Sequence, residues 1–264
     1  MLFHNTSMIS HLDHPIGTTC KPDFIACPAT STQERIHWTE IDATVEIHHS
    51  AGENLNATPD DPRHANSYAL NLLQARPDRV SVQGFYADMN GVVLIISSVG
   101  GVLESPKLNL KDAAQYQLIY AFVQRLYDPL PSMIDPTLKR RRQNSSWVFD
   151  IMLTIPHSPS AESVECVGYT IEKAPGSVGR RTHIFVNNDN PTLLNGVVIT
   201  VIKDQYCYRG HRFSEAEVLR HVHAEEDIPG VIHMAHSEDV IRGDGMPICS
   251  GGQYKKRICL VEYG

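Results

Sequence analysis

The sequence reads Val-Val-Ile-Thr-Val-Ile-Lys at residues 197–203 and Phe-Ser-Glu-Ala-Glu-Val-Leu at residues 213–219. The first stretch is a short apolar run that ends in Lys203, and we interpret it as a strand. In the second stretch, Glu215 precedes two apolar residues by three and four positions, so a helix places it one turn from an apolar face. The two stretches therefore predict a strand that ends in a lysine and a following helix that presents a glutamate.

The second half of the chain contains further strand candidates around this pair. They are residues 164–172, 182–187 and 196–203 before a short helix at 214–223, and residues 230–235 and 257–262 after it. Three strands, one helix and two more strands predict a single folded unit over residues 148–264.

A glycine-containing segment, residues 174–182, lies between the first two of these strands. Only a residue without a β-carbon lets backbone N–H groups approach a phosphate closely, so Gly176 and Gly179 are candidate phosphate contacts. The full pattern Gly-x-Gly-x-x-Gly is absent, and an ordinary hairpin turn remains the alternative interpretation.

The first half predicts an α/β accessory unit over residues 34–128. Apolar residues alternate from Ile36 to Ile47, which is typical of a half-buried strand or hairpin. A helix is expected to begin at about residue 60, followed by strands at 79–87 and 92–98 joined through Asn90-Gly91, a dipeptide suited to a tight hairpin. A second helix is expected over about 111–126.

Two segments are expected to carry little regular structure. Residues 1–33 lack apolar periodicity and are predicted to form a flexible N-terminal arm. Residues 129–147 contain prolines and the basic run Lys-Arg-Arg-Arg at 139–142, which is typical of a linker. The basic run is either a solvated stretch or a nuclear import signal.

Composition narrows the function classes. The chain has 264 residues, 42% of them hydrophobic, and a formal net charge of -7, which argues against nucleic acid as a partner. No apolar run is long enough to predict a membrane span, and no secretory signal begins the sequence. Because the six cysteines form no Cys-x-x-Cys pair, we expect reduced thiols, an intracellular location in cytoplasm or nucleus, and no metal site.

Several short motifs, in their order along the chain, resemble the fungal-type protein kinase family over roughly residues 36–264. These motifs are Ile36-His37-Trp38, Glu46, Arg76-Pro77-Asp78-Arg79-Val80, Leu126-Tyr127-Asp128-Pro129 and Val201-Ile202-Lys203. The resemblance implies an α+β chain whose residues 148–264 form a protein-kinase-like small lobe, with a mostly antiparallel sheet and one helix. It implies ATP as ligand, Mg²⁺ in full-length relatives, and transfer of phosphate to Ser or Thr side chains of proteins.

The resemblance also assigns roles to individual residues. Lys203 would bind the α- and β-phosphates, and Glu215 would pair with Lys203 and hold it in place. Glu262 and Gly264 would offer backbone groups to adenine.

The sequence departs from the family in lacking a His-Arg-Asp catalytic loop and an Asp-Phe-Gly motif. Those motifs orient the acceptor hydroxyl and hold the metal ions, so we expect this chain to bind ATP weakly and to transfer no phosphate on its own. The alternative is an inactive kinase-like module that binds or regulates protein partners of unknown identity. We also expect self-association through an exposed edge that contains Ile258, Leu260 and Val261.

A second resemblance concerns the accessory unit. The stretch from Asp42 to His48 is similar to the strand of PD-(D/E)xK nucleases, in which an aspartate and a Glu-x-Lys pair hold Mg²⁺. Here Glu46 is followed by His48 at the lysine position, and a histidine is shorter than lysine and mostly neutral near pH 7. A nuclease-like fold and a plain accessory layer both remain open, and we expect no nuclease activity.

Overall fold

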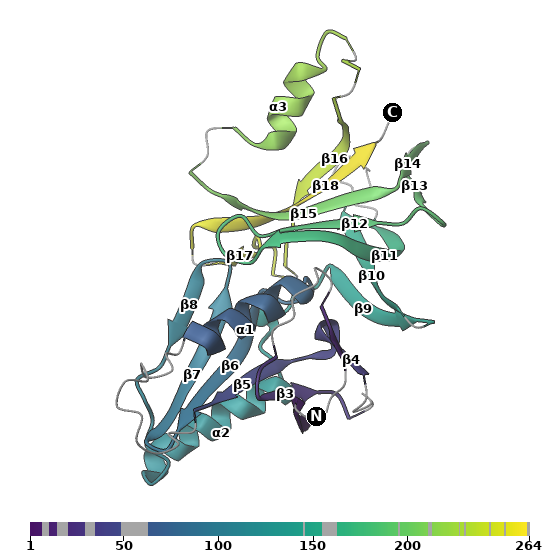
Figure 1. Ribbon diagram of the computed structural model, residues 1–264. Helices are drawn as coiled ribbons and strands as arrows, with labels where there is room; N and C mark the ends of the chain where they lie inside the picture. The colour runs from purple at the N-terminus through teal and green to yellow at the C-terminus, as the bar shows by residue number, and fades with distance from the viewer. Residues whose placement is uncertain are drawn as a thin grey trace, which may run out of the picture. The chain divides into compact units, whose positions relative to one another are not determined.

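The computed structural model divides the chain into two units, Met1–Ile134 and Asp135–Gly264, shown in Figure 1. It describes residues 1–6, 11–14, 21–29, 35–48, 63–144, 146–154, 163–194, 196–210, 213–226, 228–229, 231–242, 244–250 and 252–262. The predicted α+β class is confirmed at this coarse level, because the sheets are mostly antiparallel and helices accompany them in both units. No helix among the described residues is long and apolar enough to cross a membrane.

The first unit is built on a six-stranded sheet in the order β1-β3-β5-β6-β7-β8. The strands are β1 (Leu2–Asn5), β3 (Phe24–Cys27), β5 (Ala43–Ile47), β6 (Ser81–Asp88), β7 (Gly91–Ser98) and β8 (Gly101–Glu104). Only the β5–β6 pair is parallel within this sheet. Beside it, β2 (His11–Asp13) and β4 (Arg35–His37) form a short parallel pair, and a 3-10 helix covers Trp38–Glu40.

Two helices pack on this sheet. The helix α1 (Arg63–Ala75) buries its apolar residues with the even-numbered side chains of β6, such as Val82 and Tyr86. The helix α2 (Ala113–Tyr127) packs with Phe85, whose side chain points to the opposite face. Alternate side chains of β6 therefore pack into two hydrophobic cores, one under α1 and one under α2. The expected start of α1 at residues 60–62 lies outside the described residues.

The hairpin predicted at Asn90-Gly91 is confirmed. Strands β6 and β7 pair with Asp88 opposite Gly91, and the Asp88 carboxylate accepts hydrogen bonds from the backbone N–H groups of Asn90 (2.8 Å) and Gly91 (3.1 Å). Gly91 has φ of 153°, and a β-carbon there would collide with the carbonyl oxygen of Leu108. The turn therefore requires glycine at this position.

The second unit contains a long antiparallel sheet in the order β16-β18-β15-β12-β11-β10-β9, with β17 (Cys249–Ser250) beside β18. Its strands are β9 (Leu138–Gln143), β10 (Ser146–Thr154), β11 (Ser163–Gly176), β12 (Thr182–Val186), β15 (Val201–Tyr208), β16 (His233–Asp239) and β18 (Tyr254–Glu262). A small hairpin joins β13 (Thr192–Leu194) to β14 (Val197–Ile199). The helix α3 (Glu215–Val222) lies between β15 and β16 in sequence and contacts β16.

Both segments expected to lack regular structure contribute strands. Residues 1–33 provide β1 and β3, and the basic run lies in β9, which pairs with β10 along its whole length. Partners on β10 stabilise the charged side chains: Arg141 forms an ion pair with Asp150 (2.6 Å), and the guanidinium of Arg140 lies 4.9 Å from the ring centre of Trp147. Such cross-strand partners cannot be seen in the periodicity of a single segment.

The expectation that Ile258, Leu260 and Val261 are exposed is wrong. Ile258 and Leu260 are fully buried and Val261 is 6% exposed. The reason is that β18 is an interior strand, paired with β15 on one side and with β16 on the other.

Candidate functional site

The site begins with the alternation of side chains along β15. Ile202, Asp204 and Tyr206 are buried on one face of the sheet, whereas Lys203, Gln205 and Cys207 line a groove on the other. Strand β18 extends this surface with Lys255 and Arg257, and α3 borders it. The groove has a volume of about 1070 Å³.

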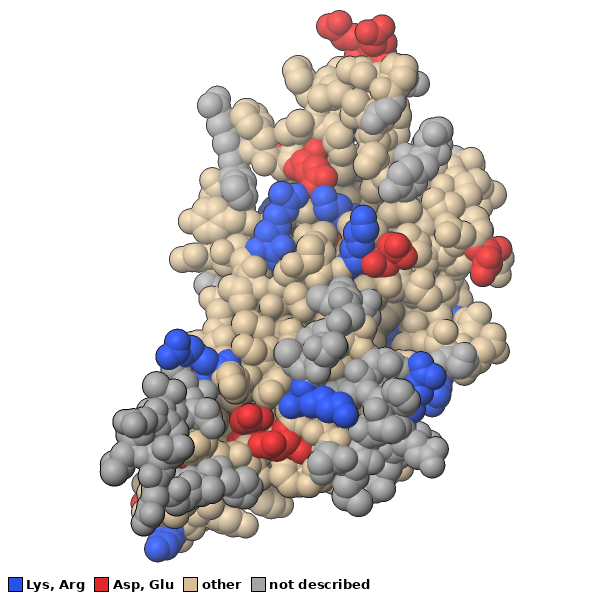
Figure 2. All heavy atoms as spheres, viewed as in Figure 1, with Lys and Arg blue, Asp and Glu red and all other residues tan. Residues whose placement is uncertain are grey.

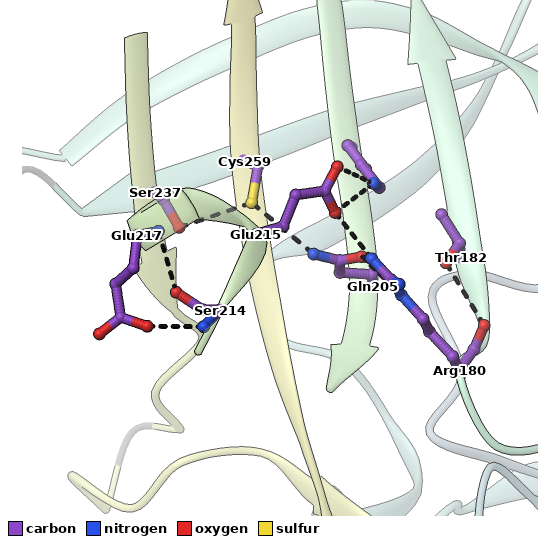
Figure 3. Close-up of polar contacts among 9 residues, drawn as sticks. Arg180, Thr182, Gln205, Ser214, Glu215, Glu217, Ser237 and Cys259 are labelled. Atoms are coloured by element: carbon purple, nitrogen blue, oxygen red, sulfur yellow. Dashed lines mark hydrogen bonds and ion pairs between the residues drawn. The ribbon is translucent and has the colours of Figure 1, made fainter. Parts of the chain in front are cut away.

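A capping box fixes the start of α3 beside the groove. The hydroxyl of Ser214 accepts a hydrogen bond from the backbone N–H of Glu217 (3.2 Å), and the Glu217 carboxylate accepts one from the backbone N–H of Ser214 (2.6 Å), as Figure 3 shows. This reciprocal pair satisfies two N–H groups at the helix start. It places Glu215 in the first turn of the helix.

The structure brings Lys203 and Glu215 together. The Lys203 ammonium donates to both carboxylate oxygens of Glu215, at 2.6 and 2.5 Å. Burial alone would raise the pKa of Glu215, but the hydrogen bond and charge of Lys203, together with the charge of Arg180, outweigh it and hold the pKa below its ordinary value. Glu215 is therefore ionised at neutral pH.

Arg180 is a member of the site that the sequence did not indicate. Its guanidinium donates to Glu215 at 2.7 Å and to the side-chain oxygen of Gln205 at 3.0 Å, and these contacts are drawn in Figure 3. The register of β12 and β15, with Thr182 opposite Gln205, brings the segment before β12 to this place. The position follows from strand pairing, so no local pattern could have revealed it.

The other predicted site residues lie around or beyond this cluster. Gly176 ends β11 opposite Thr182, and Gly179 takes φ of 72° immediately before Arg180, a conformation that favours glycine. Neither glycine lines the groove, although Pro175 and Arg180 do. Glu262 lies at the far end of β18, where it is paired with His233. Gly264 lies outside the described residues.

Basic side chains dominate the groove. Those that line it are Lys173, Arg180, Lys203, Arg209, Lys255 and Arg257, against the acids Glu215 and Glu217. Figure 2 shows blue side chains gathered beside a red group on this part of the molecule. Just outside, Asp239 forms ion pairs with Lys255 (2.7 Å) and Arg257 (2.9 Å). Cations thus exceed acids, and the surface is suited to an anionic ligand.

The first unit offers no comparable cluster in its described part. Asp42, the candidate metal ligand of the nuclease comparison, instead accepts hydrogen bonds from Arg76 (2.7 Å) and Arg79 (3.1 Å). Arg76 is 1% exposed and also forms two hydrogen bonds of 2.9 Å with Asp78. These contacts hold the segment 76–79 against β5 and are structural. Within the described ranges, no group of three or more His, Cys, Asp or Glu residues is placed to hold a metal ion.

Comparisons of the chain with protein-family models, curated proteins and solved structures find no match.

Proposed function

We propose that the second unit binds ATP weakly in the groove beside α3, in the manner of the small lobe of a fungal-type protein kinase. The observation that supports this function is the ion pair between Lys203 on β15 and Glu215 on α3. In protein kinases, a strand lysine paired with a glutamate on the following helix holds the phosphates of ATP. The helix α3 directly follows the lysine strand β15, as in that arrangement. Strands β11 and β12 precede β15 and strands β16 and β18 follow α3, while β9, β10, β13, β14 and β17 are additional strands.

Members of that family that carry a catalytic loop would transfer the terminal phosphate to protein Ser or Thr side chains, with Mg²⁺ bound. In this chain the residues that would orient an acceptor are absent from the sequence. The second candidate function is therefore an inactive kinase-like module that binds or regulates another protein.

A titration of ATP and adenosine, followed by ligand-observed NMR, tests the first candidate. We expect an ATP dissociation constant on the order of 1 mM, since one lobe supplies only part of the contacts of a kinase site. Lys203→Met should weaken ATP binding about tenfold, because the loss of one charge-assisted hydrogen bond lowers an affinity by about that factor. The affinity for adenosine, which has no phosphate, should be nearly unchanged. Lys139→Met, at an exposed position of β9, is the matched control.

Two outcomes would count against the nucleotide site. Equal loss of ATP and adenosine binding in a Lys203→Met variant that remains folded would mean that Lys203 does not act at the phosphates. No binding of either ligand by the unsubstituted chain would favour the interaction module.

A further inference from the structure

The Glu215 carboxylate is shared by two cations with very different exposure. The side chain of Lys203 is 18% exposed, whereas that of Arg180 is 60% exposed, and both contact the same oxygen of Glu215. A partly buried ammonium such as that of Lys203 keeps its carboxylate partner, because few water molecules can reach the ammonium and take the place of the carboxylate. An exposed ion pair contributes little, so Arg180 can exchange its bond to Glu215 for another anion at small cost.

The geometry of Arg180 fits such an exchange. Gln205 accepts from Nε and from one terminal nitrogen, which holds the plane of the guanidinium over β15. Among the described residues, no contact uses its second terminal nitrogen, so a donor remains for a ligand. Planar guanidinium groups bind phosphate oxygens in pairs, which an ammonium cannot do.

The surrounding charges favour a ligand of high negative charge. The groove carries six cations and two acids, and counting Asp239 still leaves a local excess of three positive charges, since six minus three is three. This excess stands in a chain of net charge -7. A divalent metal ion bound to the phosphates would cancel two of the negative charges that the groove attracts.

We infer, building on the proposed ATP site, that the groove binds the triphosphate without a divalent metal ion and that Arg180 is its second phosphate-binding residue beside Lys203. Lys203, held by Glu215, contacts one phosphate, and Arg180 turns from Glu215 to the next. The ligand class is then a free polyphosphate chain, with or without a nucleoside attached.

Phosphorus NMR titrations of the whole chain test this with two probes, ATP and inorganic tripolyphosphate, each in EDTA and in excess MgCl₂ at matched ionic strength. We expect both probes to bind in EDTA, and MgCl₂ to weaken their binding several-fold. Binding of ATP that appears only with Mg²⁺ would overturn the inference and leave the ATP site standing.

Substitutions test whether Arg180 itself contacts the polyphosphate. Arg180→Gln should weaken tripolyphosphate about tenfold in EDTA, as the loss of a charge-assisted pair implies, and Arg180→Lys should restore only part of it. The matched control is Arg220→Gln, which removes the same charge from an exposed position of α3 outside the groove lining. A control loss as large as that of Arg180→Gln would contradict a specific role for Arg180.

Adenosine separates the two proposals. If tripolyphosphate binds as tightly as ATP and adenosine does not bind, the polyphosphate inference stands and the nucleotide site fails. If adenosine binds and ATP binds no tighter in EDTA, the nucleotide site survives and the inference fails. Unchanged thermal unfolding of each variant confirms that its fold is intact.

Discussion

Asp204 is the sequence neighbour of Lys203, but its side chain points to the opposite, buried face of the sheet. It lies 2.8 Å from the Lys256 ammonium, which also forms a closer ion pair with Asp135. Burial raises the pKa of Asp204 to about 8, against the lowering effect of the Arg181 charge. Burial outweighs the nearby positive charges, so the folded chain favours the protonated form of Asp204 at neutral pH.

This proton predicts a pH-dependent stability. Between the ordinary pKa of 3.8 and the folded value of about 8, the folded chain keeps a proton that the unfolded chain has released. The free energy of unfolding therefore falls as pH rises through this window, by up to about 1.4 kcal/mol per pH unit. Asp204→Asn should flatten that dependence, as measured by urea unfolding at pH 5, 6.5 and 8.

The exposed Asp189→Asn is the control for this experiment and should leave the slope unchanged. Parallel pH profiles for the unsubstituted chain and Asp204→Asn would show that Asp204 is ionised in the folded state.

Arg76 provides a second prediction at the residue scale. Arg76→Met leaves Asp42 and Asp78 buried without their main partner, which should destabilise the first unit by about 3–5 kcal/mol. Arg125→Met, whose side chain is 45% exposed, should change stability by no more than about 0.5 kcal/mol. Denaturant unfolding followed by fluorescence of the buried Trp38 measures both. A similar small effect in the two variants would contradict a structural role for the Arg76 cluster.

At the scale of elements, β18 carries the clearest prediction. Since Leu260 is fully buried in an interior strand, Leu260→Ala should lower the free energy of unfolding by about 2–5 kcal/mol through cavity formation. It should not change the association state, which light scattering measures. Leu193→Ala, at a residue 67% exposed on β13, is the control. If Leu260→Ala kept its full stability but reduced association between copies of the chain, Leu260 would instead lie in an interface.

Elements with strong local signals could be predicted from the sequence. The β6–β7 hairpin depends on the turn at Asn90-Gly91, and α3 covers Glu215–Val222, within the helix expected at 214–223. Strand β15, however, continues to Tyr208, beyond the predicted end at Lys203. Its polar residues Asp204 and Gln205 interrupt the apolar run, and only tertiary partners such as Lys256 and Arg180 make them compatible with a strand.

The candidate site was likewise predictable only where its residues carry a local sequence signal. Lys203 and Glu215 could be proposed because each lies on a recognisable element and the resemblance to protein kinases implies that they pair. Arg180 and Gln205 could not, because their contact depends on the pairing of β12 with β15 across 25 residues. Strand register of that kind is set by the whole sheet.

At the scale of the whole molecule, charge predicts solution behaviour. The sequence has an isoelectric point of about 6.0, so net repulsion between copies is smallest near pH 6. Self-association, if it is electrostatically controlled, should be largest near pH 6 and decrease by pH 8, as light scattering can determine. Association of equal strength at both pH values would instead indicate an apolar interface.

The interior position of β18 also has a consequence for synthesis. Residues 254–262 fill the space between β15 and β16, so this sheet can close only after those residues have emerged from the ribosome. Until then the edges of β15 and β16 are unpaired, and such edges readily pair with other chains. The sheet of the second unit is therefore expected to close late in the synthesis of that unit, and its yield in cells should depend on chaperones.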